Sequence, residues 1–313
     1  MKKIINKIIN KIIHMILRKK IYKFIKDELL TTLEQSIKNS NSLLDLRAKF
    51  IDCLTYFIEH ETNKTIKFVN KNKNLLKYLD VYINQNHPNG IILIINNTKE
   101  LVINDSDKCF IINSQNVKII NTNELTILHS QNINVNNATC KLIKYSHNVD
   151  LINSTISYII NSNSIKAINC TLNFISATDL TTEFCTSIKC HHGTKIDANY
   201  CKDVILFDTS CAYTSGNTNI TCCENSYCIV TDNVTAVFEN NSNGSINGGS
   251  SIIFNNYSHG IVKNNKNLPN IILNNNSILY SSEINIDLDK IEINNNSIFK
   301  HRNKIYTKTI NEI

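Results

Sequence analysis

The sequence predicts a mainly β fold, a parallel β-solenoid that follows an N-terminal helical region. Residues 95–270 repeat every eight residues, as 22 octads in one frame without insertion or deletion. The fourth octad position is Ser, Thr, Ala or Cys in 19 of the 22 octads, and the third is Asn in 12. This period fits one short strand and one turn, because strands commonly run about five residues and Asn accepts left-handed turn geometry at low cost.

Stacking explains the small residue at the fourth position. Two octads would form a 16-residue coil, or three a 24-residue coil, and equivalent positions of successive coils would stack about 4.8 Å apart. A position that faces a narrow interior or a tight corner must then be small in every coil. We expect this small column to contain Ser114, Thr122, Ser130, Ser146, Ser154, Ser162 and Ser210, with Lys202, Val234 and Lys266 as exceptions to the pattern.

The apolar positions change phase along the repeat. In the early octads they are the seventh and first positions, as in Val117 and Ile119, whereas from about Ser154 onward they are the sixth and eighth, as in Val204 and Leu206. A one-residue change of phase turns the other face of a strand inward. We therefore expect the solenoid to change its cross-section or its corner position midway.

Residues 1–30 carry the excess charge of the chain. They hold nine basic and two acidic residues, an excess of seven that equals the net charge of the whole chain, so residues 31–313 are neutral. Isoleucine pairs recur every four residues and predict an amphipathic helix. Its anchor residues for a membrane or a partner are predicted to be Ile5, Ile9, Ile12 and Ile16 on the apolar side and Lys7, Lys11, Lys19 and Lys20 on the cationic side.

Three roles are considered for this helix. It could pack over the open end of the solenoid, or self-associate, since a solenoid must cover its terminal edge. It could lie in the interface of an anionic membrane. Nucleic-acid binding is not expected, because aromatic interleaving and a known binding fold are absent from the sequence. The lysines interrupt the segment too early for a membrane span of about 20 apolar residues, and it lacks the cleavage site of a signal peptide.

The two regions that flank the repeat are predicted to cap it. In residues 31–94, Ser42 and Asp45 have capping-box spacing, and two seven-residue series that begin at Leu43 and Leu44 indicate a helix with one buried face. Pro88-Asn89-Gly90 ends this helical cap. In residues 271–313, segments 271–282 and 291–302 resemble each other at a spacing of 20 and are expected to be terminal strands or a hairpin.

Motifs for catalysis or for cofactor binding are sparse. The eleven cysteines are odd in number and follow no secretion signal, which favours reduced thiols in an intracellular or particle-associated setting. Candidate metal ligands are Cys185, Cys190, His192 and Cys201, but their spacing matches no common zinc pattern, so we expect no metal and no cofactor. Catalytic residues are not identified. Scattered carboxylates that could form an acidic line for glycoside cleavage are Asp203, Asp208, Glu224 and Asp232.

Matches such as Asn113-Ser114, Asn121-Thr122 and Asn153-Ser154 give the repeat a resemblance to parallel β-solenoid proteins with octapeptide-like repeats, a group common among phage, viral and bacterial surface proteins. The resemblance implies architecture and transfers no catalytic residue. We expect a non-enzymatic structural, binding or adhesion rod on a helical anchor. Its expected partners are a protein or a second copy, an anionic membrane surface, or a polysaccharide. The alternative is a carbohydrate-active β-helix of tailspike or lyase type.

Overall fold

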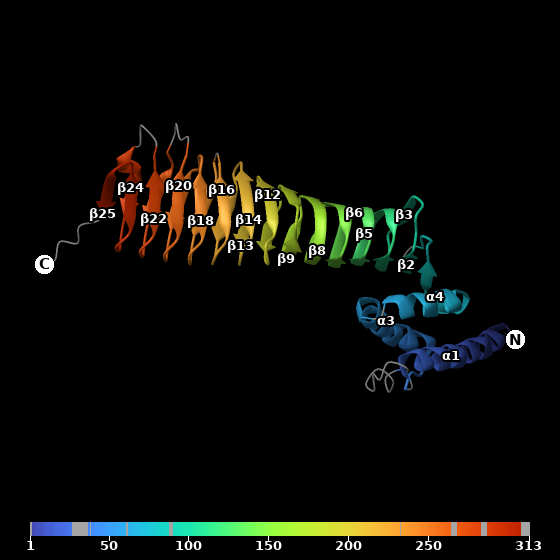
Figure 1. The fold of residues 1–313 in the computed structure, drawn as a ribbon. Helices are drawn as coiled ribbons and strands as arrows, with labels where there is room; N and C mark the ends of the chain where they lie inside the picture. The colour runs from blue at the N-terminus through green and yellow to red at the C-terminus, as the bar shows by residue number, and fades with distance from the viewer. Residues whose placement is uncertain are drawn as a thin grey trace.

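The computed structural model confirms a parallel β-solenoid with an N-terminal helical head (Figure 1). It describes the backbone of residues 2–26, 37, 39–60, 62–87, 90–231, 233–263, 268–282 and 287–307. The rod extends from the head to residue 307. The helices of the head are α1 (Lys2–Lys26), α3 (Leu43–His60) and α4 (Thr62–Leu76), followed by the 3-10 turn η1 (Lys77–Leu79).

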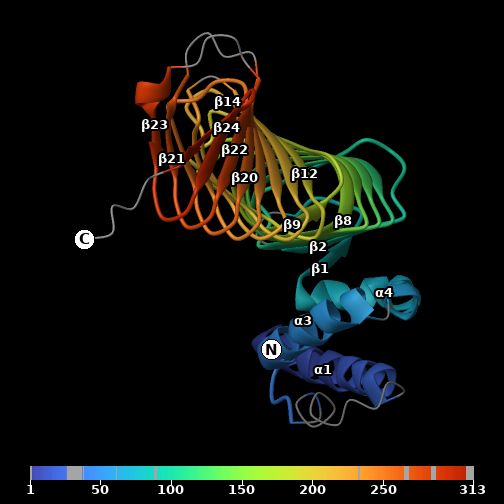
Figure 2. The same cartoon turned by 60° about the vertical axis from the view of Figure 1, so that its left-hand side comes forward.

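The strands form two long parallel faces, which separate clearly in Figure 2. Face A contains β3 (Leu101–Asn104), β7 (His147–Ile152), β10 (Leu180–Glu183), β12 (Lys195–Asn199), β14 (Cys211–Ser215), β16 (Tyr227–Val230), β18 (Asn243–Ile246), β20 (His259–Val262), β22 (Ile278–Ser281) and β24 (Ile298–His301). Face B contains β1 (Val81–Ile83), β2 (Ile91–Ile95), β4 (Lys108–Ile112), β9 (Thr171–Ala177), β11 (Ser187–Cys190), β13 (Asp203–Leu206), β15 (Asn219–Cys222), β17 (Thr235–Phe238), β19 (Ser251–Phe254), β21 (Asn270–Leu273) and β23 (Ile291–Ile293). The long strands β5 (Gln115–Leu128), β6 (Gln131–Lys144) and β8 (Thr155–Ile168) bend round a corner and contribute to both faces.

One coil of the rod takes two octads. Cys211 pairs with Lys195, and Tyr227 pairs with Cys211, each sixteen residues further along the chain. Of the two coil lengths predicted, the structure therefore has the shorter. Alternate residues of each strand point into a narrow apolar interior, which matches the two-residue period of strands.

The predicted small residues lie inside the solenoid, in two columns at different corners rather than in one. Thr122 and Ser154 belong to the second column. All seven predicted members are buried. The backbone N–H of Ser114 donates to Oγ of Ser130 at 3.1 Å, and the N–H of Ser130 donates to Oγ of Ser146 at 3.2 Å. The serine hydroxyls thus link neighbouring coils at the corner, which explains why a larger residue is excluded there. Ser210 lies in the same column, but its buried hydroxyl has no hydrogen-bond partner among the described residues.

The octad frame contains two one-residue deletions and two one-residue insertions, contrary to the prediction of an uninterrupted frame. The inward small residues are separated by seven, eight, nine, seven and nine residues in the order Cys170, Ala177, Cys185, Thr194, Cys201 and Ser210. Ser162 pairs with Ala177, fifteen residues on, and the N–H of Ala177 donates to Thr194, seventeen residues on. The other column shifts in the same way. The N–H of Cys170 donates to Cys185, fifteen residues on, and that of Cys201 donates to Thr218, seventeen residues on. The deletions and insertions cancel, and the eight-residue pattern of the sequence therefore continues across them.

This shift also explains the change of phase in the apolar positions. Before it, a left-handed residue directly precedes the small one, as Asn161 (φ 48°) precedes Ser162. After it, a spacer separates the two, as between Asp208 (φ 55°) and Ser210. The corner has moved by one residue, as expected. Lys202 is consequently no exception to the column, because Cys201 occupies the inward place and Lys202 is exposed.

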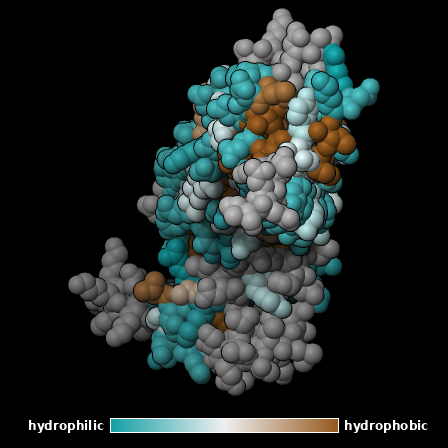
Figure 3. Space-filling view, turned by 90° about the vertical axis from the view of Figure 1, so that its left-hand side faces the viewer, coloured by the Kyte–Doolittle hydropathy of each residue, from teal (hydrophilic) through white to brown (hydrophobic). Residues whose placement is uncertain are grey.

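The rod is longer than the octad region. Strands β1 and β2 precede most of the predicted repeat, and segments 271–282 and 291–302 form two further parallel coils rather than a hairpin. The spacing of 20 is therefore the length of the last coil. The hairpin is formed instead by β24 and β25 (Lys304–Thr307), which pair antiparallel. Viewed from this end, hydrophobic residues lie among hydrophilic ones (Figure 3), and Ile305 is 65% exposed.

The helices cover the flank of the first coils. Helix α4 and η1 contact β1, and the apolar interior of the head is continuous with outward-facing residues of β2 and β4, including Leu93, Phe110 and Ile112. Strand β2 is consequently buried on both sides. The head therefore packs against the side of face B at its first strands.

Candidate functional site

Helix α1 is fixed to the rest of the head by an apolar stripe and by polar contacts that include those of His14 and Lys20. Leu17 and Ile21 are fully buried against the other helices. His14 Nε2 lies 3.2 Å from Oγ of Ser40, and Nζ of Lys20 donates to Oδ1 of Asn72 at 3.0 Å. Burial and the nearby Arg18 hold the pKa of His14 below its usual value. The position of α1 on the head is thus set by specific side chains.

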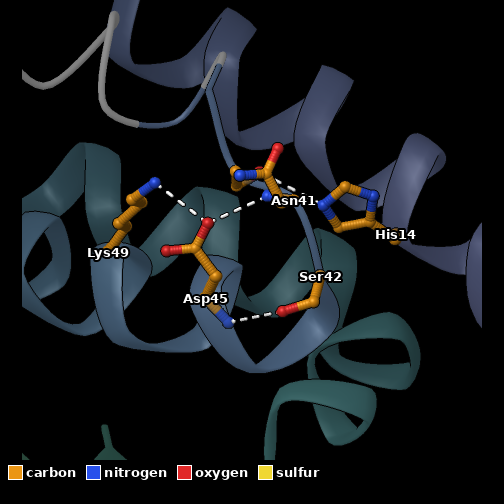
Figure 4. Close-up of polar contacts among 6 residues, drawn as sticks. His14, Asn41, Ser42, Asp45 and Lys49 are labelled. Carbon is orange, nitrogen blue, oxygen red and sulfur yellow. Dashed lines mark hydrogen bonds and ion pairs between the residues drawn. The ribbon is translucent and has the colours of Figure 1, made fainter.

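The predicted capping box lies at the start of α3, next to the contact between His14 of α1 and Ser40 (Figure 4). The N–H of Asp45 donates to Oγ of Ser42 at 3.1 Å, and the carboxylate of Asp45 accepts from the N–H of Asn41 at 2.9 Å. Lys49 donates to the same carboxylate at 3.0 Å. The hydrogen bond from Asn41, followed by that from Lys49, lowers the pKa of Asp45.

The other side of α1 presents apolar residues to solvent. Ile12 and Met15 are each 47% exposed and Ile16 is 37% exposed. Spacings of three and four residues place them on one face of the helix, with the exposed Lys19 next along that face. We call Ile12, Met15, Ile16, Lys11 and Lys19 the head face. It is the strongest candidate functional site on the head.

The structure places the predicted anchor residues unevenly. Ile12, Ile16, Lys11 and Lys19 belong to the head face, whereas Lys20 bonds Asn72 of α4. The side chains of Ile5, Lys7 and Ile9 lie outside the described residues, although their backbone belongs to α1. The sequence did not distinguish the exposed apolar stripe from the buried one. Within the described ranges, no helix has the length and apolar character required to cross a membrane.

The candidate metal ligands do not converge. Cys185 and Cys201 stack in the buried column beneath Cys170, as the sixteen-residue spacing predicts. Cys190 faces the interior from β11 on the other face, and the His192 side chain is 67% exposed at a corner. Among the residues that the structure describes, no group of three His, Cys, Asp or Glu side chains could hold a metal ion.

The three stacked thiols act as small column residues. The contact with Cys170 and burial raise the pKa of Cys185 to about 11, and the same contact lowers the pKa of Cys170. Sγ of Cys170 also donates to the carbonyl of Ile168 at 3.2 Å. These hydrogen bonds are the counterparts of those made by serine hydroxyls elsewhere in the column.

The predicted acidic line is only partly formed. Asp208 and Glu224 occupy the same corner position of neighbouring coils, with φ values of 55° and 58°. Asp208 is engaged by His192, whose Nδ1 lies 3.4 Å from its carboxylate. Asp203 begins β13 on face B, away from that corner, and Asp232 lies outside the described residues.

Amide ladders run along the corners, as expected for stacked asparagines. Asn121 donates to Asp105 at 3.0 Å, and Asn137 donates to Asn121 at 2.7 Å. On face B, an aromatic stack crosses several coils, with His191 4.5 Å from the ring centroids of both Phe174 and Phe207. These ladders give the rod a regular, largely self-bonded surface.

An open groove of about 360 Å³ interrupts this surface on face A. It lies over β10, β12, β14 and β16, and its outward side chains include Asp179, Lys195, Asp197, Tyr213 and Tyr227. None of these residues was predicted as a site. The signal was present as outward positions spaced sixteen apart, such as Asp197 and Tyr213, but it became visible only once the register was known.

Comparison with known proteins gives no match to a family model, to a curated protein or to a solved structure.

Proposed function

We propose that this protein is a non-enzymatic rod that its helical head attaches to anionic membrane surfaces. The observation that carries the proposal is the head face, where Ile12, Met15 and Ile16 are exposed beside Lys11 and Lys19. An amphipathic helix of this kind places its apolar residues at the acyl boundary and its lysines near anionic headgroups. The seven excess positive charges of residues 1–30 favour such a surface.

The rod would then project a neutral, rigid surface for binding or adhesion. Its strands are joined by hydrogen bonds from coil to coil, and the asparagine side chains of the amide ladders hydrogen-bond to one another. This role agrees with the resemblance to phage, viral and bacterial surface proteins. A particle-associated or intracellular setting is also part of the proposal. Reduced, buried cysteines are compatible with that setting.

Polysaccharide cleavage is the alternative. It requires two carboxylates that flank the scissile bond. The sequence-derived pair, Asp208 and Glu224, stacks along one corner, and Asp208 contacts His192. This arrangement favours a structural role for the pair, and we therefore propose the non-enzymatic rod.

The test is co-sedimentation of the full chain with phosphatidylcholine vesicles that contain phosphatidylserine. The triple variant Ile12→Gln, Met15→Gln, Ile16→Gln changes only exposed positions, so the head should remain folded. We expect it to bind at least about tenfold more weakly, because each apolar side chain contributes on the order of 1 kcal/mol when it enters the acyl boundary. Binding by the wild type should also weaken as salt is added.

Leu44→Gln is the matched control, because Leu44 is 73% exposed on α3 of the same head but lies outside the head face. It should bind the vesicles like the wild type. Circular dichroism verifies that all variants keep their helical signal. Equal binding by the triple variant and the wild type, or no binding by the wild type, would contradict the proposal.

A further inference from the structure

Face A contains the consecutive strands β12, β14, β16, β18, β20, β22 and β24, which lie side by side along the rod in Figure 1. One row of outward residues crosses these strands, and its register line continues toward the head through Thr181, Lys166 and Asp150. In order along the rod, the row contains Asp197, Tyr213, Ile229, Ser245, Ile261, Tyr280 and Lys300. Each member is the register partner of the next. Their strand neighbours, such as Ile196 and Ala198, point into the core, so the row itself belongs to the outer surface.

Apart from its two charged ends, the row has the same residue types in both directions. Ser245 lies at its centre, with an isoleucine on each side, a tyrosine beyond each isoleucine, and opposite charges at the two ends. Three of its large members are well exposed, because Tyr213 is 46%, Ile261 47% and Tyr280 41% accessible. Ile229 is partly buried, and Ser245, which lies between the two isoleucines, is only 4% exposed. Apolar and aromatic residues aligned in this way on an otherwise polar rod indicate a contact surface.

We infer that face A binds a second copy of this chain, antiparallel, about a two-fold axis that runs along the strand direction at Ser245. Such an axis brings a surface patch against itself. It reverses the rod axis, so every row member meets the member equally far on the other side of Ser245. Asp197 of one copy then faces Lys300 of the second, Tyr213 faces Tyr280, and Ile229 faces Ile261. A parallel arrangement would instead place Asp197 against Asp197 and Lys300 against Lys300.

The groove on face A lies at the β12 end of the row, and its charge is complementary to that of the β24 end. It is lined by Asp179, Asp197 and Tyr213, so two carboxylates and an aromatic ring meet there. At the opposite end, Nζ of Lys300 lies 5.3 Å from the ring centroid of Tyr280, which forms a cation–aromatic pair in advance. The two-fold axis places Tyr280 and Lys300 of the second copy over this groove. Lys195, which also lines the groove, adds one positive charge, so Asp179 and Asp197 leave it with a net charge of minus one.

The size of the row predicts a weak dimer. Six coil spacings of about 4.8 Å and strands of about 15 Å cover on the order of 400 Å² on each copy. Specific interfaces commonly bury about 800 Å² on each partner, and transient ones less. We therefore expect dissociation in the micromolar range. This inference does not rest on the proposed membrane attachment, because the head face and face A have no residue in common.

The test is sedimentation velocity of the full chain over a range of concentrations. Asp197→Lys alone and Lys300→Asp alone should each shift the equilibrium toward monomer, because like charges then face each other at both ends of the row. Mixing the two single variants should restore dimers, since both contacts in the mixed pair join opposite charges. The double variant should dimerise by itself for the same reason.

Asp150→Lys is the matched control, since Asp150 is an exposed acidic residue of face A on the same register line, three coils nearer the head than Asp197 and outside the proposed interface. It should dimerise like the wild type, and so should the head variant Ile12→Gln, Met15→Gln, Ile16→Gln. The inference is overturned if the wild type stays monomeric at all concentrations, or if the charge exchanges leave its dimerisation unchanged. It is also overturned if a monomeric wild type binds a neutral glucan oligosaccharide and loses that binding on Tyr213→Ala, because the groove would then be a carbohydrate site.

Discussion

The backbone N–H of Ser146 donates to Oγ of Ser162 at 3.1 Å, across sixteen residues of chain. The same hydroxyl donates to the carbonyl of Ile160 at 3.1 Å and is almost entirely buried. One small side chain therefore satisfies a backbone donor of the neighbouring coil and an acceptor of its own. The hydroxyl of Ser210, further along the same column, is buried without a partner among the described residues.

This difference predicts opposite results for one substitution at two column sites. Ser162→Ala removes two hydrogen bonds and leaves the N–H of Ser146 unpaired, so it should lower the free energy of unfolding by about 1–3 kcal/mol. Ser210→Ala removes a buried hydroxyl that has no partner and should be neutral or stabilising. Urea unfolding followed by the β-sheet signal measures both. Similar losses at the two sites would contradict the hydrogen-bond assignment.

The shifted frame predicts different costs at two adjacent residues. Cys201 is fully buried in the column, so Cys201→Phe should overpack it and lower stability by about 3 kcal/mol or more. Lys202 is exposed, and Lys202→Phe should change stability by less than about 0.5 kcal/mol. Thermal melts of the two variants provide the comparison. A greater loss of stability for Lys202→Phe than for Cys201→Phe would show that Lys202 occupies the inward place, as the uninterrupted octad frame predicts.

Acidic pH should loosen the head through His14. Burial and Arg18 lower the pKa of His14 in the folded state below the ordinary value of 6.5, against a smaller opposing effect of Asp45. As pH falls through 6.5, the unfolded state binds the proton first, so stability declines until the pH reaches the folded pKa. The midpoint of urea unfolding, followed by the helical signal, should be lower at pH 5.5 than at pH 7.5. His14→Gln should reduce this difference, and an unchanged difference would exclude His14 as its source.

The coil and its small corner positions could be predicted from the sequence, because every coil imposes the same steric demand at the corner. The sequence could not locate the two deletions and the two insertions. Thr186 occupies the fourth octad position and is small, yet it is exposed, while Cys185 takes the inward place. A small residue is tolerated at an exposed position and required at a buried one. The amino-acid types alone therefore do not show which of two adjacent small residues is buried.

The two candidate sites were predictable to different degrees. Isoleucine pairs surround much of α1, so composition indicated an apolar helix but not that Leu17 would be buried while Ile16 remained exposed. The row on face A could not be aligned from the octads. Tyr280 and Lys300 are 19 and 20 residues beyond their preceding register partners, outside the period of eight.

The longer coils leave the column intact. Ser277 follows Ser258 by 19 residues, and Ser297 follows Ser277 by 20, yet both hydroxyl oxygens of the later pair lie within 3.3 Å of each other. In the sequence, the added residues lie between a face A strand and the next face B strand. That connection therefore varies in length along the rod without a change in the pairing of the strands. It is also a suitable position at which to graft a foreign peptide for display along a rigid support.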